Sequence, residues 1–165
     1  MAGAPTPHHP TTSPQAVASN VQLPLVQQPL VQRLQQARDL AAEVLDSVAF
    51  SLLSEAEAMA VLGTVEDLGR RVDAARVASA ADIAVRSRRI LGNESLAYKN
   101  GATSGTDLIT RLTRVSSREA NRRVRLGENV TPRLAGTSML PPYYPAVAAA
   151  LTAGSLGVDA AEHIV

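Results

Sequence analysis

The scarcity of aromatic residues limits the folds open to this chain more than any other feature. One Phe, three Tyr and no Trp occur in 165 residues, while 45% of the residues are hydrophobic and many of those are alanine. A core of this composition has to be assembled from Leu, Val, Ile and Ala. These side chains suit closely packed helices better than a β-sandwich, whose strands are rich in aromatic and β-branched residues. The chain is long enough for one domain with a core, and we expect an all-α fold.

The first half of the sequence predicts a tail followed by two long helices. Residues 1–24 hold five prolines among Thr, Ser, Ala and Gln, a composition typical of disorder, and we place the helical domain in residues 25–165. Apolar residues at helical spacing predict a first helix from just after Pro29 to about residue 50. A second helix is predicted to open with a capping box of Ser54 and Glu57 and to reach about residue 89. Its length indicates that it spans the domain or pairs antiparallel with the first helix.

Shorter helices are expected after a loop over residues 92–103. Ser104, with Asp107 three residues on, predicts the start of one helix, and Ser116 and Glu119 predict a second capping box at the start of the next. The tight turn between them is compatible with a helix-turn-helix pair. The first of the two is expected to bury Leu108, Ile109 and Leu112, and the second to end at Thr131–Pro132.

Two further helices complete the predicted pattern. An alanine-rich helix is expected over about residues 145–152, closed by Gly154, and the last eight residues, VDAAEHIV, predict an amphipathic helix. No C-capping residue, glycine or polar tail follows Val165. We therefore expect the sequence to be a fragment of something longer, with this last helix cut off by the chain end.

The helix predicted after Ser116 carries a row of cations. At about 100° per residue, one side holds what we call the arginine face, and the opposite side holds Ala120, Val124 and Gly127. From residue 101 to 135, seven arginines stand against three acidic residues, although the whole chain has a net charge of only +1. The planar fork of arginine suits phosphate groups, so this helix is a candidate for contact with DNA. The arginine face consists of Arg118, Arg122, Arg125 and Asn129, and the candidate nucleic-acid-binding residues are these four with Arg114 in the turn.

The residue types give little support to a catalytic or metal-binding interpretation. There is no cysteine, and the histidines are His8 and His9 in the tail and His163 near the end. The adjacent pair could hold a metal loosely, but a flexible polar tail accounts for it, and a lone histidine such as His163 is commonly a surface or packing residue. We find no Ser-His-Asp arrangement, no glycine loop for phosphate and no metal-ligand cluster, so we expect no cofactor and no small-molecule ligand. With no signal peptide and no apolar run of about 20 residues, we expect a cytoplasmic protein that does not enter a membrane.

Two segments of the second half carry a resemblance to a known family. The first runs from Gly101 to Val124 and the second is ALTAGSLGVDAAEHIV, from residue 150 to the end. In order and spacing they resemble domain of unknown function 222, the N-terminal helical region of the actinobacterial 13E12 repeat proteins, and the resemblance extends over roughly residues 30–165. The residues that carry it are Gly101, Ser104, Leu108, Ile109, Ala120, Val124, Ala150, Leu151, Gly154, Leu156, Ala161 and Ile164. The sequence departs from the family pattern in having no Trp beside Leu108, an alanine at position 160 and a glycine cap at position 157.

The resemblance implies an association with DNA-processing proteins, because many family members carry a His-Asn-His (HNH) nuclease domain further downstream. It does not imply catalysis by these residues, since such a nuclease needs a histidine base and a metal held on a hairpin and helix. The chain is then a non-catalytic N-terminal helical domain of an HNH endonuclease-type protein that contacts DNA through the arginine face.

Two other interpretations of the sequence stay open. In one, the arginine face is a solvated surface, and the arginine content reflects a GC-rich genome. The long helices within residues 30–90 also fit a helical oligomerisation or protein-interaction module without nucleic-acid binding, which predicts concentration-dependent self-association and little salt-sensitive affinity for DNA.

Overall fold

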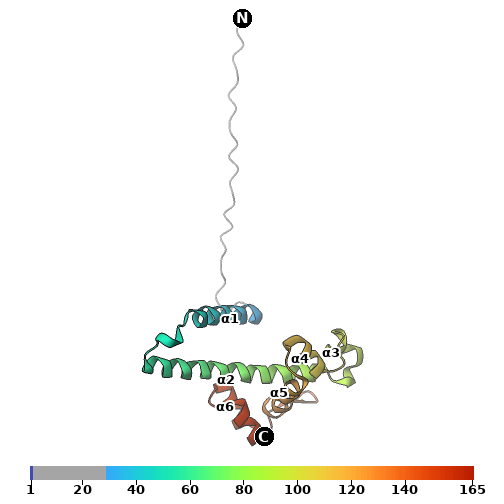
Figure 1. Ribbon diagram of the computed structural model, residues 1–165. Helices are drawn as coiled ribbons and strands as arrows, with labels where there is room; N and C mark the ends of the chain where they lie inside the picture. The colour runs from blue at the N-terminus through green and yellow to red at the C-terminus, as the bar shows by residue number, and fades with distance from the viewer. Residues whose placement is uncertain (2–28) are drawn as a thin grey trace. The chain divides into compact units, whose positions relative to one another are not determined.

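The computed structural model describes Met1 and residues 29–165, and it divides into two compact units, Met1–Phe50 and Ser51–Val165. Apart from Met1, the predicted tail of residues 1–24, with its histidine pair, lies outside the described residues. Apart from one small hairpin, the regular structure of the described residues is helical, so the all-α prediction is confirmed (Figure 1).

The described part of the first unit holds one long helix. α1 (Leu30–Ser47) begins directly after Pro29, as predicted, and buries none of its residues. Many of its apolar side chains are exposed, including Leu30, Val31, Leu34, Leu40 and Val44. Because α1 belongs to a different unit from the next long helix, the antiparallel pairing of the two stays a prediction.

The second long helix, α2 (Glu55–Arg86), starts with the predicted capping box. The backbone N–H of Ser54 donates to the Glu57 carboxylate at 2.9 Å, and the Glu57 N–H donates to the Ser54 hydroxyl at 3.3 Å. The helix ends three residues before the predicted limit because the backbone becomes extended at Arg88. The predicted loop over residues 92–103 is partly wrong, since short helical turns occupy most of it.

The remaining elements follow in chain order. Short 3₁₀ helices precede and follow α2: η2 (Phe50–Leu52) and η3 (Arg89–Glu94). After them come α3 (Leu96–Lys99), α4 (Gly105–Thr113), α5 (Ser117–Val130), β1 (Arg133–Ala135), β2 (Ser138–Leu140), α6 (Pro145–Ala153) and α7 (Val158–Ile164). None of the helices in the described part of the chain combines the length and apolar character needed to cross a bilayer.

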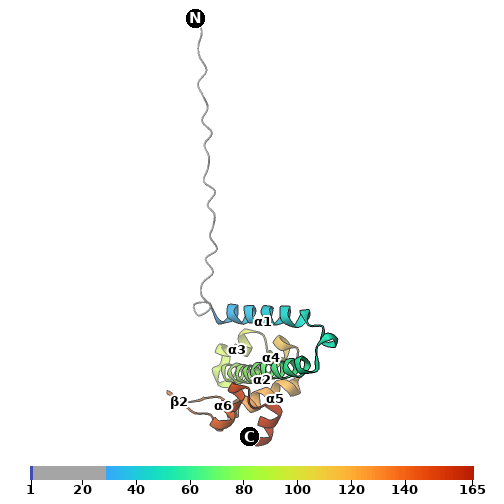
Figure 2. The ribbon, with the colours of Figure 1, turned by 90° about the vertical axis from the view of Figure 1, so that its left-hand side faces the viewer.

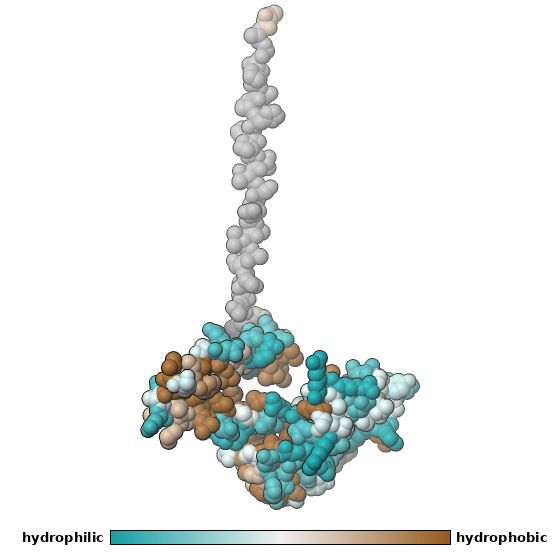
Figure 3. Space-filling model, in the orientation of Figure 1, coloured by the Kyte–Doolittle hydropathy of each residue, from teal (hydrophilic) through white to brown (hydrophobic). Residues whose placement is uncertain are grey.

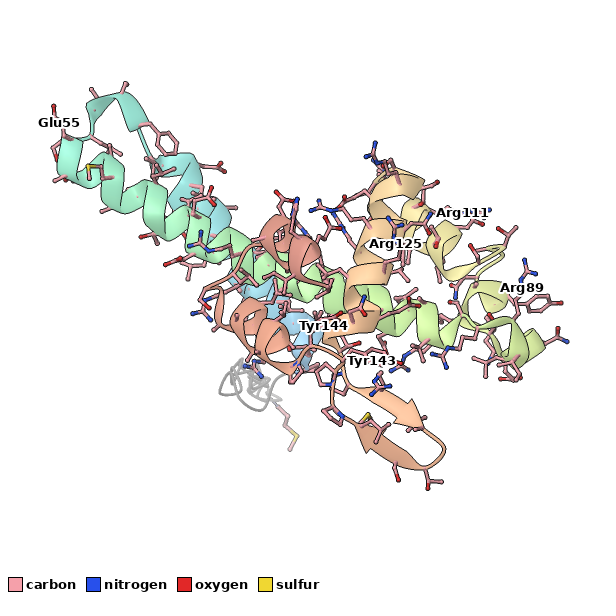
Figure 4. The ribbon with its side chains drawn as sticks, turned by 90° about the horizontal axis from the view of Figure 1, so that it is seen from below. Glu55, Arg89, Arg111, Arg125, Tyr143 and Tyr144 are labelled. Carbon is pink, nitrogen blue, oxygen red and sulfur yellow. The ribbon has the colours of Figure 1, made fainter. Side chains whose placement is uncertain are left out.

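Two glycines allow α4 and α5 to approach α2 closely. A Cβ on Gly127 would lie 2.6 Å from the Ala81 Cβ and 2.7 Å from the Val77 carbonyl oxygen. A Cβ on Gly105 would lie 2.9 Å from the Ala84 Cα. All three distances are too short for a real side chain, so each glycine marks a point where one helix packs closely on another. In the view of Figure 4, α5 crosses α2.

The core of the second unit is built around the C-terminal half of α2. Its largest cluster joins α2, α5, α6 and α7, and its buried members are Val77, Leu126, Val130, Val147, Leu151 and Ala161. The N-terminal part of α2 buries none of its residues before Val77. Figure 3 shows apolar side chains gathered over the first turns of this helix.

The hairpin of β1 and β2 was not predicted from the sequence. Leu134 pairs with Met139 and Ala135 with Ser138, and Gly136 in the turn has a φ of 61°, which glycine adopts without strain. The Arg133 guanidinium stacks on the Tyr143 ring at 3.6 Å from its centroid. Figures 2 and 4 show the hairpin projecting from the helices.

Candidate nucleic-acid interface

The two short helices α4 and α5 are joined by a three-residue turn, as predicted. The Ser104 hydroxyl caps α4 by accepting from the Asp107 N–H at 3.1 Å, and the Ser116 hydroxyl caps α5 by accepting from the Glu119 N–H, also at 3.1 Å. Between them, Arg114 adopts the left-handed conformation, with φ 58° and ψ 23°, which reverses the chain direction at the end of α4. Arg114 is the one non-glycine residue with positive φ among the described residues.

A shared core fixes the geometry of these two helices on α2. Its buried members are Ala80 of α2, Ile109 of α4 and Ala120 of α5, and Val115 of the turn packs against them. Leu108 is also buried, but Leu112 is 68% exposed, so its predicted burial is wrong. The reason is that Leu112 lies in the last turn of α4, at the edge of the contact with α2, where it borders a shallow hollow.

Three of the candidate residues are exposed cations. Arg114, Arg118 and Arg125 face solvent, and none of them forms an ion pair within the part of the chain that the structure describes. Figure 4 labels Arg125 on α5. Positive charge on this surface is therefore not neutralised by the fold, as a contact with phosphate requires.

Arg122 has different surroundings from the rest of the arginine face. Its Nε donates to the Glu162 carboxylate at 2.7 Å, it also pairs with Asp159, and its Nη1 lies 3.5 Å from the Glu119 carboxylate. The hydrogen bond to Glu162, supported by Asp159, raises the pKa of Arg122 above its ordinary value despite partial burial. The side chain is only 28% exposed and ties α5 to α7.

The neighbouring Arg123 is also committed to the fold. Its Nε donates to the Glu119 carboxylate at 2.8 Å, and its side chain is 15% exposed. The Glu119 carboxylate therefore pairs with two arginines and accepts no hydrogen bond from the Ser116 backbone N–H. Of the predicted capping box, only the bond from the Glu119 N–H to the Ser116 hydroxyl is present.

Asn129, the last of the candidate residues, is half-buried, and its amide nitrogen donates to the Arg125 carbonyl oxygen at 3.0 Å. Asn121, which is not among the residues predicted from the sequence, is exposed on α5 and accepts a hydrogen bond from the Thr106 hydroxyl at 2.9 Å. Its position three residues after Arg118 and four before Arg125 could have indicated it, because residues at these spacings are neighbours on a helix surface.

Asp107 stabilises the start of α4, beside this surface. Its carboxylate accepts from the Thr103 N–H at 2.8 Å and from Arg111 Nε at 2.8 Å. These contacts, with the backbone bond to Thr103 the strongest cause, lower the pKa of Asp107 below its ordinary value. Arg111 also donates to the Gly101 carbonyl oxygen, so its guanidinium is used within the fold.

A cleft of about 560 Å³ lies between α2, α5 and the start of α7. Both signs of charge line it, and they pair with each other: Arg122 with Asp159, and Arg70 with Glu66 at 3.8 Å. Arg70 also donates to the Gly154 carbonyl oxygen at 2.7 Å.

Within residues 29–165, no three His, Asp or Glu side chains are grouped as metal ligands would be. His163 lies on α7, with its Nδ1 2.7 Å from the Asp159 carbonyl oxygen.

Comparison with known proteins supplies a family but no characterised relative. No curated protein and no solved structure matches the chain. The family model described as domain of unknown function (DUF222) matches residues 59–165, which include all of the α4–α5 pair and the helices that support it. The resemblance noted in the sequence is thereby confirmed over residues 59–165. Because the match covers more than half of its length, the chain belongs to the DUF222 family.

Proposed function

We propose that α4 and α5 form a DNA-binding helix-turn-helix in which α5 contacts duplex DNA. The observation that carries this proposal is the three-helix arrangement of α2, α4 and α5 around Ala80, Ile109 and Ala120, with exposed arginines on the outer side of α5. In helix-turn-helix proteins the second helix of such a pair lies in the major groove, and its N-terminal residues contact base edges.

The turn between the helices supports the same proposal. A left-handed residue at this place is normally glycine, because any other side chain is strained there. Here the position is Arg114, and its side chain is exposed. Backbone strain of this kind is often retained where a side chain has a function, and a cation between two helices suits contact with a phosphate.

In this proposal Arg118, Arg125 and Arg114 supply the DNA contacts, and Arg122 holds α7 against α5. The chain acts as a non-catalytic helical domain, and any cleavage of DNA falls to an HNH nuclease domain elsewhere in a larger protein. The resemblance to HNH-associated proteins supports this division of roles.

Fluorescence anisotropy with a labelled random-sequence duplex at two salt concentrations tests the proposal. We expect binding at low salt that weakens steeply as salt rises. Replacing both Arg118 and Arg125 with Ala should weaken binding and lower the salt slope by about 2, one unit for each phosphate contact. The matched control removes the same charge from α1, with Arg33→Ala and Arg38→Ala. Equal losses in the two double variants, or no binding by the unmodified chain at low salt, would contradict the proposal.

A second candidate function, self-association with another copy of the chain, is supported by exposed apolar side chains. Met59 and Leu62, both on the N-terminal half of α2, are 73% and 65% exposed. The first buried residue of α2 is Val77, in the C-terminal half of the helix. Apolar surface of this kind is often an interaction site.

Sedimentation velocity over a range of protein concentrations tests this second candidate. We expect the weight-average mass of the unmodified chain to rise with concentration and that of a Met59→Lys, Leu62→Lys variant to remain monomeric. Thr64→Lys, on the same stretch of helix but at a polar exposed position, is the control and should associate like the unmodified chain. A monomer at every concentration would exclude self-association.

A further inference from the structure

The outer side of α5 places an amide between two arginines. Arg118, Asn121 and Arg125 are all exposed, and Asn121 lies three residues after the first and four residues before the second. Residues at these spacings share one face of a helix. At about 100° per residue Asn121 lies to one side of the two arginines, toward Thr106 of α4. If α5 lies along DNA as proposed above, the two cations approach the phosphates and Asn121 lies beside them, within reach of a base edge.

We propose that Asn121 reads a base edge and that the base is adenine, an inference that rests on the DNA-binding role of α5. The Asn121 amide is held from a second helix and yet stays exposed. Thr106 of α4 donates its hydroxyl to Asn121 Oδ1 at 2.9 Å. No other side-chain hydrogen bond of Asn121 is present among the described residues, so the rest of its amide is free.

The bond from Thr106 leaves the hydrogen-bonding groups that adenine needs. An amide oxygen has two lone pairs and an amide nitrogen has two hydrogens, so after the Thr106 contact one lone pair and both N–H groups of Asn121 remain. In the major groove adenine presents an acceptor at N7 and a donor at N6, which this donor and acceptor pair matches. Guanine presents two acceptors, N7 and O6, and the second would face the Asn121 oxygen.

A contact from Asn121 to a phosphate is the alternative, and it predicts a different result. A phosphate contact would support binding to every sequence equally, whereas a base contact distinguishes one sequence from another. The two are separated by measuring sequence preference together with affinity for random duplex.

The test is selection of binding sites from a randomised duplex pool, followed by affinity measurements on the selected duplex and on versions with single base changes. We expect the unmodified chain to select a site with one adenine whose replacement weakens binding by about 10-fold. Asn121→Ala should lose the preference at that base pair and keep most of its affinity for random duplex. Thr106→Val, which removes the hydroxyl at similar volume, should reduce the preference without abolishing it.

Asn129→Ala is the matched control, because the Asn129 amide already donates to the Arg125 carbonyl oxygen. It should select the same site as the unmodified chain. Retention of the same preference in Asn121→Ala, or loss of affinity for all sequences alike, would overturn the assignment of Asn121 while leaving DNA binding by α5 intact. Failure of the unmodified chain to bind any duplex at low salt would overturn both.

Discussion

Arg122 and Glu162 lie forty residues apart in the sequence and 2.7 Å apart in space, measured from Nε to the carboxylate oxygen. Asp159, one turn before Glu162 on α7, pairs with the same guanidinium. One arginine of the helix proposed to contact DNA therefore fastens that helix to the last helix of the chain. Its two α7 partners are both anionic, so removing the arginine would leave like charges close together.

Arg122→Ala is expected to destabilise the second unit by about 1–2 kcal/mol, because the lost pair is partly buried and two carboxylates remain without a cation. Urea unfolding measures this change, and amide hydrogen exchange should show faster exchange in α7 than in α2. Arg86→Ala is the control, since Arg86 forms an exposed pair with Asp82 on α2. Exposed ion pairs contribute little to stability. A loss of stability in Arg86→Ala as large as that in Arg122→Ala would contradict the role of Arg122 in holding α7 against α5.

A second prediction concerns the close contact of α5 with α2. Gly127→Ala should destabilise the fold by about 1–3 kcal/mol or more, because the new Cβ has no space between Val77 and Ala81. Gly63→Ala, on the exposed part of α2 with no atom near its Cβ, should stabilise the fold by about 0.5–1 kcal/mol through helix propensity. Thermal unfolding of the two variants and of the unmodified chain measures both changes in stability. A stabilising Gly127→Ala would mean that the helices are not in contact there.

Features that depend on neighbouring residues were predicted well from the sequence. The N-caps of Ser54, Ser104 and Ser116, the start of α1 after Pro29 and the end of α6 at Gly154 are all confirmed. Each depends on residues within one helical turn, where the chemistry of capping and of glycine is strong enough to decide the structure. The buried side of α5, which includes Ala120 and Gly127, was predicted from helical periodicity, which is also a local property of the sequence.

Features that depend on distant residues were missed. Nothing in the spacing of α5 indicates that Arg122 meets two acids near the chain end, since that contact exists only after α6 brings α7 against α5. The strands of the hairpin have three residues each, too few to show alternation. Leu112 continues the apolar pattern of α4, but its side chain borders a shallow hollow beside α2 and stays exposed.

The lowered pKa of Asp107 predicts a pH dependence. Its folded-state pKa is below that of the unfolded chain, so its stabilising contribution is complete above the unfolded value of about 3.9 and is lost as the pH falls through the lowered folded value. Asp107→Asn removes the charge and should lower the melting temperature at neutral pH. The difference from the unmodified chain should shrink toward zero as the pH falls below about 4. A difference that is constant with pH would show that the charge of Asp107 makes no contribution.

If the chain binds DNA as proposed, Arg114→Gly is expected to raise stability and to weaken DNA binding. Glycine accepts a φ of 58° without strain, whereas another L-residue pays about 1–2 kcal/mol there, so Arg114→Gly should raise stability by about 1 kcal/mol. The same change removes an exposed cation from the turn and should weaken binding to random-sequence duplex, with a salt slope lower by about 1. Arg114→Lys keeps both the charge and the strain, and should resemble the unmodified chain in both measurements. A glycine variant that is more stable and binds equally well would place Arg114 outside the DNA contact.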